Sequence, residues 1–194
     1  MMAKKDLTGK KIAILVDEGF EQVELIKPRK ALDKIGAQTQ VVSPQEGEVR
    51  SWNMKRWGKS VAVDVPLESA DPAQFDALLL PGGVMNPDKL RMNPKAVEFV
   101  KHFFDAGKPV AAICHAPWTL IEADVLKDRT LTSWPSLKTD IRNAGGKWVD
   151  EEVVSDMGLV TSRNPDDIKA FNKTMIEEFA EGEHNRRHGE RRVA

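Results

Sequence analysis

The single cysteine of the chain, Cys114, is followed directly by His115. Both come after residues 109–113, a short apolar run typical of a strand buried on both faces. A residue at a tight turn between a strand and a helix is pushed out of the sheet, and the backbone N–H groups behind it face whatever binds there. The arrangement predicts a nucleophilic thiol at the end of a strand.

A helix is expected directly after this strand, with Pro117 in its first turn. The partial positive charge of a helix N-terminus favours a thiolate, so we expect a lowered pKa for Cys114 and reactivity at neutral pH. The alternative is that Cys114 is a small buried hydrophobic residue, the ordinary state of a free cysteine. Neighbouring residues of a helix do not face each other, so this spacing favours a role for His115 toward a substrate rather than deprotonation of Cys114.

A glycine turn offers further backbone donors. The apolar segment 75–80 ends in Pro81-Gly82-Gly83, which indicates a strand that leads into a turn. We expect the backbone N–H groups of His115 and Gly83 to hold an oxyanion together. By itself the triplet is a weak signal, because most Pro-Gly-Gly sequences are simple turns.

Three glutamates follow the first apolar run, residues 11–16: they are Glu18, Glu21 and Glu24. A carboxylate beside a thiol raises the pKa of the thiol, so a useful partner would be a protonated carboxyl that donates a hydrogen bond. The alternative for each glutamate is a charged group that faces solvent. The sequence pattern does not choose among the three.

The elements that position these residues alternate between strands and helices. Apolar runs predict strands at 11–16, 39–43, 61–65, 75–80 and 109–113, and weaker ones at 130–133, 147–149, 153–155 and 158–162. Helical spacing of apolar residues predicts helices at 21–35, 94–106, 114–121, 136–143 and 166–179. Segment 45–60 is polar and rich in turn residues, and we expect an excursion there. The alternation predicts an α/β sandwich with a mostly parallel central sheet and helices on both faces.

The composition limits the class of protein. The 194 residues carry 29 Lys plus Arg and 30 Asp plus Glu, a formal net charge of −1, which argues against specific nucleic-acid binding. The length fits one domain, residues 1–181, followed by a polar, Arg-rich tail at 182–194 that we expect to be flexible. No run of 18 apolar residues occurs, so we expect a soluble, cytoplasmic protein with no membrane partner.

No metal or cofactor site is expected. One cysteine cannot form an internal disulfide or a multi-Cys metal site. The four histidines, His102, His115, His184 and His188, show no useful ligand grouping, because His184 and His188 are four residues apart but lie in the expected tail. No dinucleotide-binding or phosphate-binding glycine pattern follows a strand.

Three blocks of the sequence together resemble the PfpI branch of the ThiJ/PfpI superfamily. They are DALLLPGG at 76–83, GKPVAAICHAP at 107–117 and LVTSRNPDD at 159–167. The similarity spans about residues 10–180, and the Ala-Ile-Cys-His block in order with Pro-Gly-Gly is highly specific. The resemblance implies a flavodoxin-like sandwich, a nucleophilic Cys114 with His115 as its partner, and Glu24 as the acid hydrogen-bonded to the cysteine.

The resemblance also implies a third acidic residue that comes from a neighbouring subunit, just after the Pro-Gly-Gly turn. The matching position is Asp88, in a loop that is one residue longer than the family pattern. In that case the active site is shared between chains, and activity requires a homo-oligomer, a dimer or larger.

Two departures from the family pattern concern the pocket. Ala116 replaces the glycine that usually follows Cys-His, which adds a methyl group near the nucleophile, and Gly82, Ala116 and Trp118 are expected to line the pocket. The Trp-bearing segment 50–58 is longer than in the shortest members. Trp52, Trp57 and Trp118 are expected either to wall the pocket or to pack between subunits.

The functions associated with this family share one chemical logic. They are intracellular peptidase, glyoxalase acting on methylglyoxal, deglycase removing early glycation adducts from proteins or nucleotides, and stress-protective redox sensor or chaperone. In the enzymatic versions a thiolate adds to a carbonyl, backbone N–H groups hold the oxyanion, and His115 moves protons. We favour a stress-protective cysteine hydrolase that acts on a small carbonyl substrate or a glycated protein.

Three alternatives remain at this point. One is a cysteine peptidase with the same nucleophile. Another is a non-catalytic stress protein whose thiol is oxidised to a sulfinate. A glutamine amidotransferase also has its nucleophilic cysteine at a tight turn between a strand and a helix. Its His-x-Glu pattern, however, occurs near the C-terminus only at 188–190, in the expected tail.

Overall fold

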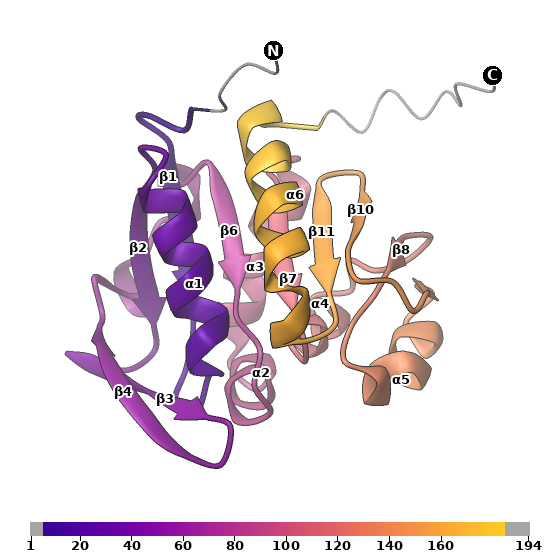
Figure 1. Cartoon of the computed structure of the whole chain (residues 1–194), viewed down its shortest axis with the longest axis horizontal. Helices are drawn as coiled ribbons and strands as arrows, with labels where there is room; N and C mark the ends of the chain where they lie inside the picture. The colour runs from indigo at the N-terminus through magenta and orange to yellow at the C-terminus, as the bar shows by residue number, and fades with distance from the viewer. Residues whose placement is uncertain (1–5, 185–194) are drawn as a thin grey trace.

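A computed structural model describes residues 6–184 of the chain. Its central sheet contains seven strands, which are β1 (Lys11–Leu15), β2 (Gln38–Ser43), β5 (Val65–Pro66), β6 (Ala77–Leu80), β7 (Val110–Ile113), β10 (Val154–Asp156) and β11 (Leu159–Ser162). Their order is β10-β11-β7-β6-β1-β2-β5, and all pairs are parallel except β10 with β11 (Figure 1). The predicted α/β fold with a mostly parallel sheet is confirmed.

Helices cover both faces of this sheet. One face carries α1 (Gln22–Asp33) and α6 (Ile168–Glu181), and the other carries α2 (Met85–Arg91), α3 (Pro94–Asp105) and α4 (Pro117–Glu122), with α5 (Lys138–Asn143) next to α4. Figure 1 shows α1 and α6 in front of the sheet and α3 behind it. Strands β6, β7 and β11 are therefore buried along their whole length, as their continuous apolar runs predict.

The register of the sheet brings strand ends together. Leu80 pairs with Ala112 between β6 and β7, and Ile14 pairs with Leu79 between β1 and β6. Because these strands are parallel, their carboxyl ends lie at one edge, where α/β folds of this type place their ligand sites. The segments after β1, β6 and β7 therefore meet.

Segment 45–60 differs from the expectation. It forms an antiparallel hairpin of β3 (Glu48–Asn53) and β4 (Arg56–Ala62), which extends from the lower left of the molecule in Figure 1. The expected strand at 61–65 is wrong as one element, because residues 61–62 end β4 and only Val65–Pro66 pair with β2. The pattern was misleading because β4 is largely exposed and carries few apolar residues.

Two smaller features complete the described chain. Strands β8 (Thr130–Leu131) and β9 (Lys147–Trp148) form a separate parallel pair. None of the described helices is long and apolar enough to cross a bilayer. Of the expected tail, residues 182–184 are described, whereas residues 185–194, which include His188 and the 188–190 triplet, lie outside the described part.

Candidate active site

Cys114 lies directly after β7, at the carboxyl edge of the sheet. Its φ is +64°, in the left-handed region that favours glycine. The N–H of Cys114 donates to the carbonyl of Ser162 at 3.0 Å, and its carbonyl accepts the N–H of Trp134 at 2.9 Å. Strain of this kind persists only where the surroundings fix the backbone. Here the end of β11, at Ser162, and the loop at Trp134 hold the turn that presents the thiol.

The side chains of Cys114 and His115 are in contact. The distance from Sγ of Cys114 to Nδ1 of His115 is 3.2 Å. The two can meet because residues 114–116 form a turn and α4 begins only at Pro117. The expected helix over 114–121, with neighbouring side chains apart, is wrong at this point. His115 is close enough to exchange a proton with the thiol.

Glu24 is the glutamate that the fold brings to the thiol. It is fully buried in the first turn of α1, and its Oε2 accepts a hydrogen bond from the N–H of Gly82 at 2.8 Å. A Cβ added to Gly82 would lie 2.7 Å from Oε2 of Glu24 and 2.8 Å from Cβ of Cys114. Only glycine fits between the acid and the cysteine.

The protonation state of Glu24 follows from its burial. Burial, with a smaller contribution from the negative charge of Glu21, raises the pKa of Glu24 to about 8. Glu24 is therefore largely protonated at neutral pH, the state that can donate a hydrogen bond. The pKa of Glu21 is also raised by burial, and Oε1 of Glu21 has no hydrogen-bond partner among the described residues.

The thiol itself is harder to ionise than the sequence predicts. Burial raises the pKa of Cys114, and a negative charge on Glu24 raises it further, whereas the N–H groups of Gly83 and His115 lower it. The predicted lowering by a helix N-terminus is wrong, because α4 has only six residues and begins at Pro117, too far away to offset desolvation. The two N–H groups are the features that favour the thiolate, and a neutral Glu24 removes the charge that would oppose it.

Aromatic rings enclose His115. Its imidazole stacks on Trp134, with ring centroids 5.6 Å apart and an interplanar angle of 22°, and its centroid lies 5.3 Å from that of Trp118. Burial lowers the pKa of His115 to about 4, so the ring is neutral at pH 7 and can accept a proton. The sequence analysis missed Trp134, although it directly follows the expected strand at 130–133.

The predicted pocket tryptophans divide into two groups. Trp118 lies at the site, where its Nε1 donates to Oδ2 of Asp140 at 3.0 Å and the guanidinium of Arg91 lies 5.4 Å from its ring. Trp52 and Trp57 lie on the β3–β4 hairpin, with ring centroids 5.5 Å apart in an edge-to-face arrangement. The hairpin tryptophans therefore pack against each other.

Asn86 is a buried positioning residue that the sequence analysis missed. Its Nδ2 donates to the carbonyls of Pro81 at 2.8 Å and Gly82 at 3.1 Å, and its Oδ1 accepts the N–H of Asp17 at 2.6 Å. The side chain thus joins the turn after β6 to the turn after β1 and fixes the backbone next to Gly83. The available signal was an Asn three residues after a Gly-Gly turn.

Two other predicted residues, Asp88 and Ala116, are placed by the structure on α2 and in the core. Asp88 is on the exposed side of α2, with Oδ1 3.9 Å from Nε of Arg91, so its contribution to a partner chain's site stays a prediction. Ala116 is buried in the core that α3 and α4 cover. Its methyl group therefore fills the core beneath the turn.

The β3–β4 hairpin supports the segment that leads to Glu24. The N–H of Gly19 donates to the carbonyl of Arg50 at 2.8 Å, and the N–H of Trp52 donates to the carbonyl of Phe20 at 2.7 Å. These bonds connect the start of α1 to β3. The acid of the thiol site is thereby held by an element outside the main sheet.

Known proteins are similar in sequence to this chain over most of its length. The DJ-1/PfpI family model matches residues 10–178. Protein/nucleic acid deglycase 2 of Escherichia coli (strain K12) is 44% identical over 169 residues, which cover 87% of this chain and 96% of the relative. YraA of Bacillus subtilis (strain 168), provisionally named a cysteine protease, is 41% identical over 168 residues, which cover 87% of this chain and 97% of the relative.

A solved structure agrees with these matches. DJ-1beta of Drosophila melanogaster has a TM-score of 0.80 and 28% sequence identity, covering 88% of this chain and 90% of its own. The family match includes Glu24, the glycine turn and the Cys114-His115 pair. On both sequence and fold, the chain belongs to the DJ-1/PfpI family.

Proposed function

We propose that the protein is a cysteine-dependent deglycase, which acts on methylglyoxal and on early glycation adducts of proteins and nucleotides. The observation that carries the proposal is the Cys114 thiol, 3.2 Å from Nδ1 of a neutral His115 and beside the buried acid Glu24. The name of the Escherichia coli relative supports the substrate class. The thiol is the only one in the chain.

The proposed chemistry couples proton transfer to sulfur attack. As Sγ of Cys114 adds to a carbonyl carbon of the substrate, its proton moves to Nδ1 of His115, so the C–S bond forms while the S–H bond breaks and no free thiolate has to form first. The carbonyl oxygen becomes an oxyanion, which the N–H groups of Gly83 and His115 stabilise. Neutral Glu24 adds no charge that would oppose this oxyanion.

The remaining steps return the enzyme to its starting state. In a glycation adduct, a hemiaminal, the attacked carbonyl is the aldehyde that forms when the C–N bond breaks, the amine takes up a proton and the hydroxyl on the same carbon loses one. After sulfur adds to this aldehyde carbon, His115 moves protons as the hydrogen on that carbon passes to the neighbouring ketone carbon, and water then hydrolyses the resulting thioester and restores the thiol. For a methylglyoxal adduct, one water is consumed and a free amine and lactic acid are released. The aldehyde-level carbon is oxidised and the ketone carbon is reduced within the same molecule, by proton shifts through an enediol, so the electrons balance.

The decisive test compares wild type with Cys114→Ala and Cys114→Ser. Both variants should lose methylglyoxal consumption and the release of free amine from a methylglyoxal-treated peptide, with an unchanged far-UV circular dichroism spectrum. Trp57→Ala, on the hairpin, is the matched control and should retain turnover. Full turnover in Cys114→Ala would overturn the proposal.

A second candidate, a cysteine peptidase, is favoured by the name of the Bacillus subtilis relative. Cleavage of casein that Cys114→Ala abolishes, with no amine release from glycated peptides, would select it. Selective peroxide oxidation of Cys114 to a sulfinate, with no turnover of any carbonyl, would select a redox sensor.

The family resemblance further supports a shared site in which a partner subunit contributes Asp88. The side chain of Asp88 is 64% exposed, so a second chain can reach it. Co-expression of Asp88→Ala with Cys114→Ala should restore part of the activity, because a mixed oligomer contains one intact site. Inactive mixtures would contradict the shared site and leave the chemistry of Cys114 unaffected.

A further inference from the structure

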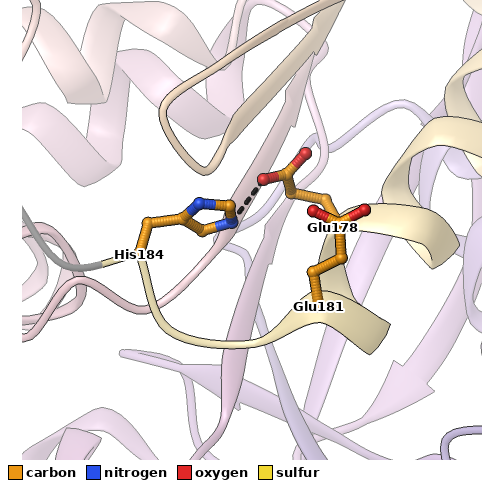
Figure 2. A group of neighbouring side chains, drawn as sticks. All are labelled: Glu178, Glu181 and His184. Atoms are coloured by element: carbon orange, nitrogen blue, oxygen red, sulfur yellow. Dashed lines mark ion pairs between the residues drawn. The ribbon is translucent and has the colours of Figure 1, made fainter. Parts of the chain in front are cut away.

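Three side chains converge at the C-terminal end of α6, outside the thiol site. Glu178, Glu181 and His184 each place one potential ligand atom within 4.8 Å of the other two. The glutamates are three residues apart and share a face of α6, and Gly182, with a φ of +83°, ends the helix before His184. Figure 2 shows the imidazole and both carboxylates pointing into one space. We call these residues the C-terminal cluster.

The cluster contains a deeply buried carboxylate that lacks a Lys or Arg partner among residues 6–184. The side chain of Glu178 is only 10% exposed, and its Oε1 lies 2.5 Å from Nε2 of His184, the contact drawn in Figure 2. This contact lacks hydrogen-bond geometry, and Nε2 is a buried atom without a hydrogen-bond partner in the described chain. No Lys or Arg of residues 6–184 forms an ion pair with Glu178 or Glu181.

Buried polar atoms in this state are costly, since each has lost its contacts with water. A protonated imidazole of His184 would neutralise the charge of one carboxylate at most. A divalent cation that shares all three side chains would neutralise both carboxylates and use the free ring nitrogen. The buried Nε2 of His184, which has no hydrogen-bond partner in the described chain, and the two carboxylates beside it therefore point to a ligand with positive charge.

Neighbouring residues hold two of the three ligands in place. Oγ of Ser155, on β10, donates to Oε2 of Glu178 at 2.7 Å, the kind of outer contact that orients metal-binding carboxylates. The backbone N–H of His184 donates to the carbonyl of Gly107 at 2.8 Å. Its ring packs on Gly158, where an added Cβ would lie 3.0 Å from Cδ2.

Solvent can reach the cluster from one side. A cavity of about 800 Å³ is lined by Gly107, Gly158 and His184, among other residues. Glu181 is exposed and can move onto an ion after it enters. The site is thus preformed on the Glu178 side and open on the Glu181 side.

We propose that the C-terminal cluster binds one divalent transition-metal ion, with Zn²⁺ the best match. One imidazole and two carboxylates are common ligands of zinc, and water can complete a tetrahedral set. The imidazole favours zinc over magnesium, which prefers oxygen ligands alone. The ion would join the end of α6 to the β10–β11 turn and to the connection between α3 and β7. The sequence analysis expected no metal site because it considered cysteine and histidine ligands and not the carboxylates of α6.

Zinc binding to the full chain carrying Cys114→Ala tests this inference, because that substitution removes the only thiol as a competing ligand. Isothermal titration with ZnCl₂ at pH 7.5 should give one ion per chain. His184→Ala, Glu178→Gln and Glu181→Gln should each weaken binding by about tenfold or more. His102→Ala, which removes a histidine of α3 outside the cluster, is the matched control and should bind as its parent.

A second readout separates binding from folding defects. An ion that binds only the folded chain raises the melting temperature, so ZnCl₂ should stabilise the parent and His102→Ala but not His184→Ala. Glu181→Gln changes an exposed side chain and remains informative if another variant unfolds. Absence of binding at 100 µM ZnCl₂, unchanged affinity in both His184→Ala and Glu181→Gln, or displacement of Zn²⁺ by equimolar MgCl₂ would each overturn the proposal.

Discussion

The backbone N–H of Gly82 donates a hydrogen bond to Oε2 of Glu24 at 2.8 Å, and Gly82 separates this acid from Cys114. An oxygen that accepts a hydrogen bond from an N–H group is poorly placed to carry a proton itself. The proton of neutral Glu24 therefore belongs on Oε1, which is buried and has no other hydrogen-bond partner in the described chain. The turn after β6 thus decides which oxygen of the acid can donate.

Replacing Glu24 with Gln should change how stability depends on pH. The pKa of Glu24 is about 8 in the folded chain and 4.5 in its ordinary state, so between these values the unfolded state loses the proton first. Relative to Glu24→Gln, wild type should lose stability as pH rises from 4.5 to 8, and the opposite contribution from the lowered pKa of His115 is common to both proteins and cancels in the comparison. The gap in pKa sets an upper bound of about 5 kcal/mol. Urea unfolding at pH 4.5 and 7.5 measures it, and parallel curves for the two proteins would contradict the raised pKa.

The same substitution should alter the reactivity of the thiol. Above pH 8 the charge on Glu24 opposes formation of the Cys114 thiolate, whereas a glutamine stays neutral. Iodoacetamide should therefore label Glu24→Gln faster than wild type at pH 9. Since Cys114 is the only thiol, mass spectrometry of the intact chain reports this site alone. Slower labelling of the variant at pH 9 would show that hydrogen bonding, not charge, dominates.

Cys114→Gly and Cys114→Ala should differ in stability. Both remove the sulfur, but the φ of +64° suits glycine and strains alanine. We expect Cys114→Gly to be more stable by about 1 kcal/mol in urea unfolding. An alanine variant of equal or higher stability would mean that the turn relaxes when the sulfur is removed.

Trp134→Ala should raise the pKa of His115 from about 4 toward its ordinary value. The stacked indole keeps water from the imidazole, and burial is the cause of the lowered pKa. NMR titration of the ring protons should show a rise of about one pKa unit or more. Trp57→Ala should leave the titration unchanged, and an unshifted His115 in Trp134→Ala would mean that other groups exclude the water.

Asn86→Ala should affect both stability and turnover. The substitution leaves the N–H of Asp17 and the carbonyls of Pro81 and Gly82 without their partner, which costs about 3 kcal/mol. Turnover should fall because the turn that carries the Gly83 N–H is released. Asn93→Ala, which removes the N-cap of α3, should cost about 1 kcal/mol with normal turnover. Normal turnover in Asn86→Ala would rule out a positioning role.

The sequence predicts the central sheet well because each parallel strand is buried on both faces and appears as a continuous apolar run. Residues 110–113 illustrate this, with all four positions buried. The hairpin of 48–62 escapes prediction because β4 is solvated on most positions. The helix α2 escapes it because Asn86-Pro87 is typical of a turn, whereas Pro87 here lies in the first helical turn and Asn86 bonds to other segments.

The candidate site shows the same division. The order of motifs along the chain predicts that Cys114, the glycine turn and the segment of Glu18, Glu21 and Glu24 meet, because parallel strands end at one edge. The choice of Glu24 among the three glutamates came from the family resemblance. The contact of Cys114 with His115 depends instead on the delayed start of α4 at Pro117, which periodicity does not reveal. The raised pKa of the thiol depends on desolvation, which is a property of the folded packing and not of residue order.

The hydrogen bonds from Gly19 to Arg50 and from Trp52 to Phe20 affect how long the arrangement of Glu24 beside Cys114 persists. A two-stranded hairpin is only marginally stable by itself, so β3 and β4 are expected to open locally more often than the sheet. Each opening breaks the hydrogen bonds that hold Gly19 and Phe20, the residues that lead into α1, and so loosens the position of Glu24 beside Cys114. Amide exchange at Gly19 and Trp52 should therefore proceed as one cooperative event, and its frequency limits how long a catalytically assembled site survives.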